Sequence, residues 1–198
     1  MLKIFISGIE YRLSLLFPAA VVILLTLDQT GIAAWCLAAS VMHEFGHFAA
    51  MYAFGSRPSS VNIGFFGVAV KRNPGISVNH AESMLIALAG PAVNLVSFII
   101  LYSLTGWTVP VIVHLIMALF NLLPVESLDG GQALYYAMAE PLGEEKAERV
   151  VFLMSVLLLI PLATAGFFLL LHSRYNFTLL AVSLYLGLLI AFKRKNVN

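Results

Sequence analysis

The stretch IAAWCLAASVMHEFGHFAAMYAF, residues 32–54, decides the fold class, because a long apolar run surrounds two histidines and a glutamate. About 20 helical residues cross the hydrocarbon core of a bilayer, so this run is long enough to be a membrane span. An acidic side chain at the centre of a span costs about 2.5 kcal/mol or more. The cluster HEFGH, residues 43–47, is therefore interpreted as a functional site. The alternative is a few polar residues tolerated in a buried helix.

The rest of the chain is apolar as well. Of 198 residues, 61% are hydrophobic and 11% are charged, whereas about a quarter of the residues of a typical soluble domain are charged. Lysine and arginine total 11 against 10 acidic residues, so no basic field exists to bind nucleic acid. The single cysteine, Cys36, excludes an internal disulfide and any CxxC or zinc-knuckle motif.

Further apolar runs predict additional membrane spans. We expect six spans in all, with the shorter first, fourth and sixth runs extending into their flanks, and four or five spans as alternatives. The first run is interpreted as a retained span, because LTLDQTG after it lacks a small-x-small cleavage site. The six runs are residues 13–27, 32–54, 81–104, 107–123, 150–171 and 177–192.

The distribution of positive charge predicts how these spans are oriented. Positive residues concentrate on the cytoplasmic side of membrane proteins. With six spans and both termini cytoplasmic, only Arg174 falls in an outside turn. The inside segments then hold Lys3, Arg12, Arg57, Lys71, Arg72, Lys146, Arg149, Lys193, Arg194 and Lys195.

Two segments are not expected to span. Residues 59–72 are rich in β-branched and aromatic residues and contain two glycines, which predicts a short hairpin or a bulged strand that dips into the membrane interface. Residues 139–150 read as a charged cytoplasmic connector. The predicted fold is therefore an all-α polytopic membrane protein with about six transmembrane helices and a membrane-associated β-hairpin between spans two and three. We expect one domain over residues 1–198.

The spacing within HEFGH predicts a metal site. Residues i and i+4 share a helix face, so His43 and His47 can bind one ion, with Glu44 beside them. Two histidines and a carboxylate form a known catalytic zinc set, and zinc lowers the pKa of bound water to about 7. Asp129 is the candidate third ligand, since the predicted topology places it at the same membrane side as the end of the histidine span. Gly130 and Gly131 are expected to allow a tight turn beside it.

Three motifs together resemble the site-2 protease family of intramembrane zinc metalloproteases. They are HEFGH, AGPAVN at residues 89–94, and NLLP with LDGG between residues 121 and 131. The likeness is greatest to the sporulation-type branch, whose membrane domain has six spans. The resemblance implies that His43, His47 and Asp129 bind one Zn²⁺ and that Glu44 activates water.

The resemblance also implies weaker site assignments. Asn94 and Asn121 match family asparagines that contact substrate or the active-site loop, and Phe65 and Phe66 complete the expected substrate-binding set. The alternatives stay open: Asn94 could equally satisfy helix backbone near Pro91, Asn121 suits a structural role before a helix break, and the aromatics could face lipid or the core.

The sequence departs from the family at two points. Relatives often have proline where this chain has Ser127, and many carry a nucleotide-sensing (CBS) domain or a PDZ domain that is not seen here. The chain is expected to be either a minimal form or a truncated one.

The predicted function is hydrolysis of a peptide bond in or near the transmembrane segment of a membrane-bound substrate. The family suggests a transcription-factor precursor as substrate, a bacterial cell membrane as location, and inhibitory membrane proteins as candidate partners; sporulation is a weaker inference. A metal transporter or channel is the main rival, although no internal symmetry between halves is visible. A catalytically inactive scaffold is the second rival, against which the intact Glu44 argues.

Overall fold

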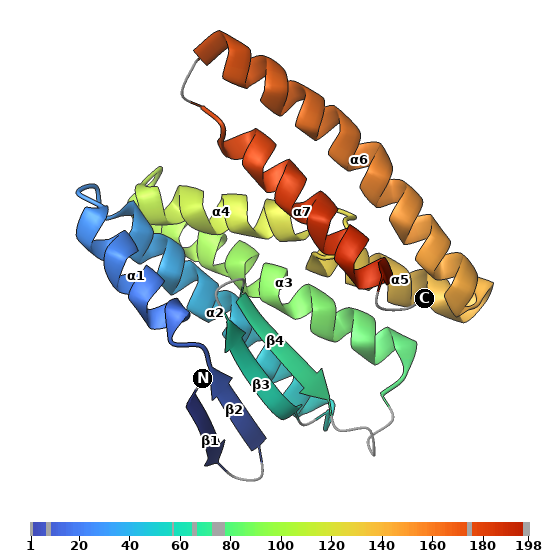
Figure 1. Cartoon of the computed structure of the whole chain (residues 1–198). Coiled ribbons are helices and arrows are strands. Elements are labelled where there is room, and N and C mark those ends of the chain that lie inside the picture. The colour runs from blue at the N-terminus through green and yellow to red at the C-terminus, as the bar shows by residue number, and fades with distance from the viewer. Residues whose placement is uncertain are drawn as a thin grey trace. The chain divides into compact units, whose positions relative to one another are not determined.

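The computed structural model describes residues 2–6, 9–56, 58–64, 67–72, 78–173 and 176–195. The chain divides into two compact units, residues 1–120 and residues 121–198. The first contains the sheet and helices α1 to α4, and the second contains helices α5 to α7 (Figure 1).

The described strands of the first unit form one sheet in the order β1-β2-β3-β4. β3 (Pro58–Gly64) and β4 (Gly67–Arg72) pair antiparallel, so the hairpin expected at residues 59–72 is confirmed. β1 (Leu2–Ile6) and β2 (Ile9–Leu13) form a second antiparallel pair, and β2 runs parallel to β3. This first hairpin was not expected, although the Ser-Gly dipeptide between two short apolar segments is a turn signal.

The first and fourth apolar runs form short helices. α1 is Leu16–Leu27 with 12 residues, and α4 is Val109–Asn121 with 13 residues. At 1.5 Å per residue they are about 18–20 Å long, less than the hydrocarbon thickness of about 30 Å. The expected extension of the first run into its flanks is wrong, because β2 ends at Leu13 and the helix ends before Asp28. Asp28 lies in the turn after α1, where its carboxylate accepts the backbone N–H of Thr30 (2.8 Å) and of Ala33 (2.7 Å).

Helices α2 (Ile32–Ala53) and α3 (His80–Thr105) pack against each other. Their contact is close at Gly46, where an added Cβ would lie 2.6 Å from the carbonyl oxygen of Ala89. α3 begins with a capping box in which the Asn79 side chain accepts the N–H of Glu82 (2.7 Å) and the Glu82 carboxylate accepts the N–H of Asn79 (3.1 Å). The Gly46 contact fixes the face of α2 that is turned towards α3.

Within the described residues, α3 and α6 (Glu144–Ser173) are long and apolar enough to cross a membrane by length and composition. Three helices have shorter apolar stretches: α1, α4 and α7 (Thr178–Lys195), whose apolar part is Thr178–Phe192. α2 has 22 residues, but the polar cluster HEFGH lowers its mean hydropathy, and it is not among these candidates. Each apolar run of the sequence thus corresponds to a helix, while the count of six spans stays a prediction.

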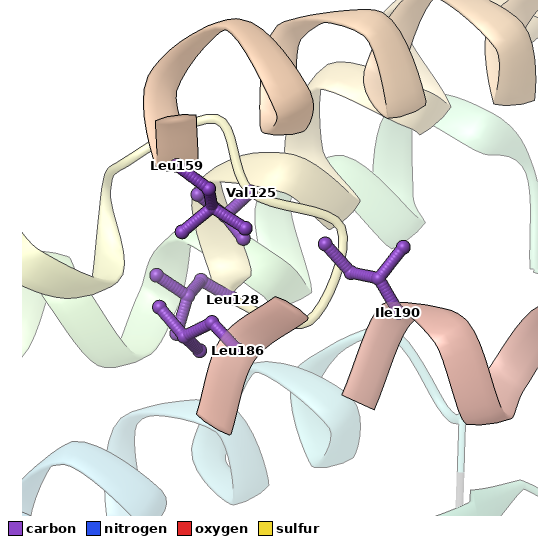
Figure 2. Packing of buried hydrophobic residues seen from close by; sticks show 5 residues of the cluster. All are labelled: Val125, Leu128, Leu159, Leu186 and Ile190. Carbon is purple, nitrogen blue, oxygen red and sulfur yellow. The ribbon is translucent and has the colours of Figure 1, made fainter. Parts of the chain in front are cut away.

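The second unit begins with a loop that leads into α5 (Asp129–Leu142). The charged connector expected at residues 139–150 is largely helical, since these residues end α5 and begin α6, with Gly143 between them at φ 82°. Its cytoplasmic location stays a prediction. α6 contacts both α5 and α7. Figure 2 shows the core of this unit, where two loop residues meet side chains of α6 and α7: Val125, Leu128, Leu159, Leu186 and Ile190.

Candidate metal centre

His43 and His47 lie one turn apart on α2, and their Nε2 atoms are 3.1 Å apart. The His43 side chain is 6% exposed and His47 is partly buried. Two nitrogens that each lie 2.0–2.1 Å from one tetrahedral zinc ion are roughly 3.3 Å apart. The spacing of the pair therefore fits a single zinc ion.

The other ring nitrogen of His47 also has a partner. Its Nδ1 lies 2.8 Å from the carbonyl oxygen of Ile86 on α3. Because a carbonyl oxygen can only accept, Nδ1 carries the proton of the neutral ring, and Nε2 presents a lone pair. This is the arrangement typical of metal-binding histidines, whose second nitrogen donates to a carbonyl or carboxylate.

Behind His43 lie two more buried polar side chains. Asn94 on α3 is 0% exposed, and its Nδ2 is 3.2 Å from Nδ1 of His43. Its Oδ1 is 3.1 Å from Nδ1 of His114 on α4. His114 on α4 thus makes a hydrogen bond to the neighbouring helix α3. Neither role weighed for Asn94 from the sequence anticipated two histidine partners, and its substrate contact stays a prediction.

Gly90, the second residue of the AGPAVN motif, faces the two imidazoles. A Cβ added there would overlap Nε2 of His47 and lie 2.8 Å from Nε2 of His43. No side chain fits between α3 and the two nitrogens. Gly90 was not among the predicted site residues, and the signal that could have found it is a glycine within an otherwise apolar helix.

Glu44 follows His43 on α2 and is partly buried. A carboxylate next to the histidine pair is of the type that accepts a proton from water in zinc hydrolases. Its role as a general base stays a prediction.

In the second unit, Asp129 is the first residue of α5, where a negative charge is favoured by the helix dipole. The expected turn at Gly130 and Gly131 is wrong, because both are helical. A Cβ on Gly130 would overlap the carbonyl oxygen of Leu122, and one on Gly131 the carbonyl oxygen of Val125. Glycine is required here because the preceding backbone lies directly against the first helical turn.

Ser155 on α6 holds that same loop. Its Oγ accepts the backbone N–H of Glu126 (2.8 Å) and donates to the carbonyl of Val151 (2.8 Å), and the side chain is 0% exposed. Together with the buried side chains of Val125 and Leu128, this bond fixes the segment that leads to Asp129. Sequence reasoning missed Ser155; the signal is a hydroxyl group in the middle of an apolar run.

The remaining predicted site residues are less informative. Asn121 is the last residue of α4 and is partly buried, as is Ser127 in the loop. Phe65 and Phe66 lie outside the described residues, so their expected substrate contacts are untested.

The second unit also contains a polar pocket of about 220 Å³ beside the first turn of α5. Tyr135 lines it, and burial, followed by the charges of Glu144 and Glu148, raises the pKa of the Tyr135 hydroxyl. The pocket is lined by Glu126, Gly131, Gln132, Tyr135, Tyr136, Glu148 and Val151.

No family model matches the chain, but the chain is similar to a curated protein and to a solved structure. A protein of Synechocystis sp. (strain ATCC 27184 / PCC 6803 / Kazusa) named a putative zinc metalloprotease is 34% identical over 115 residues. This match covers 49% of the chain and only 28% of the relative's length. A site-2 protease from Methanocaldococcus jannaschii has the same fold, with a TM-score of 0.60, 20% identity, and coverage of 93% of this chain and 91% of that one.

Proposed function

We propose that this protein is an intramembrane zinc metalloprotease of the site-2 protease type. The observation that carries the proposal is the histidine pair on α2, whose Nε2 atoms lie 3.1 Å apart against Gly90 while both other ring nitrogens are held by α3. The fold shared with a site-2 protease and the relative named as a zinc metalloprotease support the same conclusion.

The proposed zinc ligands are His43, His47 and Asp129. Each offers one ligand atom, giving two imidazole nitrogens and one carboxylate oxygen, the donor set of catalytic zinc sites that keep a fourth position open. When bound, zinc supplies Lewis-acid polarisation of a carbonyl and acidification of water.

The chain's own residues carry the proton transfers and hold the substrate. Glu44 accepts a proton from the attacking water at a carboxylate oxygen and delivers it to the leaving amine nitrogen. The substrate segment must unwind, because helical hydrogen bonds protect its carbonyls. An extended segment can add to an edge strand of a sheet, and β4 is the hairpin strand that suits this, because β3 already pairs with both β2 and β4.

The finer parts of the proposal follow from charge and from the family resemblance. The substrate is a membrane-bound protein, such as a transcription-factor precursor, within the bilayer of a bacterial cell. Both termini face the cytoplasm, as the ten-to-one distribution of positive residues supports. We propose that the substrate contacts Asn121, Phe65 and Phe66. Inhibitory membrane proteins are candidate partners. Within the family, the sporulation-type branch is the proposed assignment.

The test is Glu44→Gln in the purified, detergent-solubilised protein and in cells. We expect stoichiometric zinc to remain, because Glu44 is not a proposed ligand, while cleavage falls by at least about 100-fold through loss of the base. Comparative proteomics of membrane fragments identifies the substrates whose cleavage depends on Glu44.

Glu82→Gln is the matched control, because this partly buried glutamate caps α3 and is not a proposed site residue, and glutamine keeps a side-chain oxygen that can accept the N–H of Asn79. It should keep both zinc and cleavage. Persistent proteolysis by the Glu44→Gln protein would overturn the mechanism, and zinc flux through liposomes without proteolysis would favour the transporter.

A further inference from the structure

Three buried side chains from three helices form a continuous chain of contacts in the first unit. Nδ1 of His43 lies 3.2 Å from the Asn94 amide, whose other polar atom lies 3.1 Å from Nδ1 of His114. The exposed fractions are 6% for His43, 0% for Asn94 and 4% for His114. Buried polar atoms need hydrogen-bond partners, and these three side chains supply partners to one another.

The proposed metal site dictates the direction of these bonds. A neutral imidazole carries one proton, so when Nε2 of His43 binds zinc its proton must be on Nδ1. Nδ1–H needs an acceptor, and within the amide only the oxygen accepts. A half-turn of the Asn94 side-chain amide exchanges its oxygen and nitrogen and keeps both contacts.

The orientation of the Asn94 amide also determines the tautomer of His114. With the Asn94 oxygen facing His43, the amide nitrogen faces His114 and must donate to Nδ1 of that ring. Nδ1 of His114 then has no proton, and the ring carries its proton on Nε2. All three side chains stay neutral, and no net proton is taken up or released.

We propose that Asn94 and His114 are positioning residues that hold His43 in the tautomer required for zinc binding. The inference rests on the proposed zinc site. With the amide turned so that its oxygen faces His43, Asn94 accepts the proton of Nδ1 of His43, as the Ile86 carbonyl accepts the proton of Nδ1 of His47. His114 holds the far end of the Asn94 amide by accepting from its nitrogen, and its Nε2–H tautomer follows from that orientation.

The first test compares zinc affinity among variants by competition with a chelator. Loss of such a second-shell partner lowers metal affinity by about 10- to 100-fold, which is the result expected for Asn94→Leu. Asn94→Asp keeps an acceptor oxygen towards His43 and should recover most of that affinity. Ser97→Ala is the control, because it alters a buried polar position on the same helix and should bind zinc as the wild type does.

The second test reads the tautomer of His114 directly from its ¹⁵N chemical shifts in the zinc-loaded protein. We expect the Nε2–H form in the wild type and the Nδ1–H form in Asn94→Asp, because a carboxylate can only accept. A role confined to packing would not move this signature.

The outcomes separate the two proposals. A wild-type protein that binds no zinc contradicts the proposed function. A wild-type protein that binds zinc, together with a folded Asn94→Leu protein of equal affinity, overturns the role of Asn94. If Asn94→Leu fails to fold, the ¹⁵N spectra decide: an Nδ1–H form of His114 in the zinc-loaded wild type overturns the inference.

Discussion

At the residue scale, the candidate site depends on the two histidines and equally on the absence of a side chain at Gly90. The i, i+4 spacing of His43 and His47 is a local property of a helix, so the sequence alone predicted that they share a face. The space in front of them is set by a different helix. That space exists because α3 presents a glycine, and nothing in HEFGH itself could have revealed it.

Gly90→Ala is expected to abolish zinc binding. The added methyl group would overlap Nε2 of His47 and press on Nε2 of His43, so one ring must rotate away from its partner. Zinc content after dialysis against buffered metal measures the effect, and we expect at least a 100-fold loss of affinity.

Gly187→Ala is the matched control for this change. It is also a glycine-to-alanine change within a helix, but its added Cβ meets no atom within 4 Å. It should bind zinc normally and gain slightly in helix propensity. A Gly90→Ala protein that keeps wild-type zinc affinity would show that the metal does not lie between these nitrogens.

At the scale of elements, the sequence predicted apolar helices well and polar ones poorly. The apolar runs correspond to helices because length and hydropathy are summed over many residues. α5 was missed because its first turn contains two glycines and its last turn contains Pro141, which locally indicate a turn. Packing of the loop backbone against Gly130 and Gly131 overrides that local preference. Likewise, the bond from the Glu126 N–H to Ser155 joins α6 to a loop 29 residues earlier, a pairing that no local pattern specifies.

Ser155→Ala should destabilise the loop that leads to Asp129. The change leaves the N–H of Glu126 without its acceptor in a partly buried position, which costs about 1–3 kcal/mol. Thermal unfolding in detergent measures the loss, and zinc affinity should fall with it if Asp129 is the third ligand.

Thr164→Ala provides the comparison within the same helix. Thr164 donates to the carbonyl four residues earlier (2.8 Å), as Ser155 does, but it is exposed to the surroundings of the helix. Its removal should change stability by no more than about 0.5 kcal/mol. Equal effects of the two substitutions would mean that the bond to the loop contributes nothing.

At the scale of the whole molecule, the distribution of positive charge predicts six membrane crossings, but the first helix is short for a crossing. Both termini are expected on one side of the membrane, which requires an even number of crossings. α1, with 12 residues, is about 18 Å long, so a crossing there requires local thinning of the bilayer or help from flanking residues. The sequence could not predict this, because the apolar run starts at Leu13, and only the structure shows that Leu13 ends β2 and that the helix starts at Leu16.

Cysteine labelling tests whether α1 crosses. In a Cys36→Ala background, which is free of cysteine, Gln29→Cys places a thiol in the exposed turn after α1 and Glu144→Cys places one at the exposed start of α6. With both termini cytoplasmic, a membrane-impermeant maleimide should label Gln29→Cys in intact cells and Glu144→Cys only after permeabilisation. Because a short crossing keeps residue 29 near the hydrocarbon boundary, its labelling should also be slower than that of a fully solvated thiol. Labelling of both positions from the cytoplasmic side alone would mean that the first run enters the membrane and returns, and the count of six crossings would then be wrong.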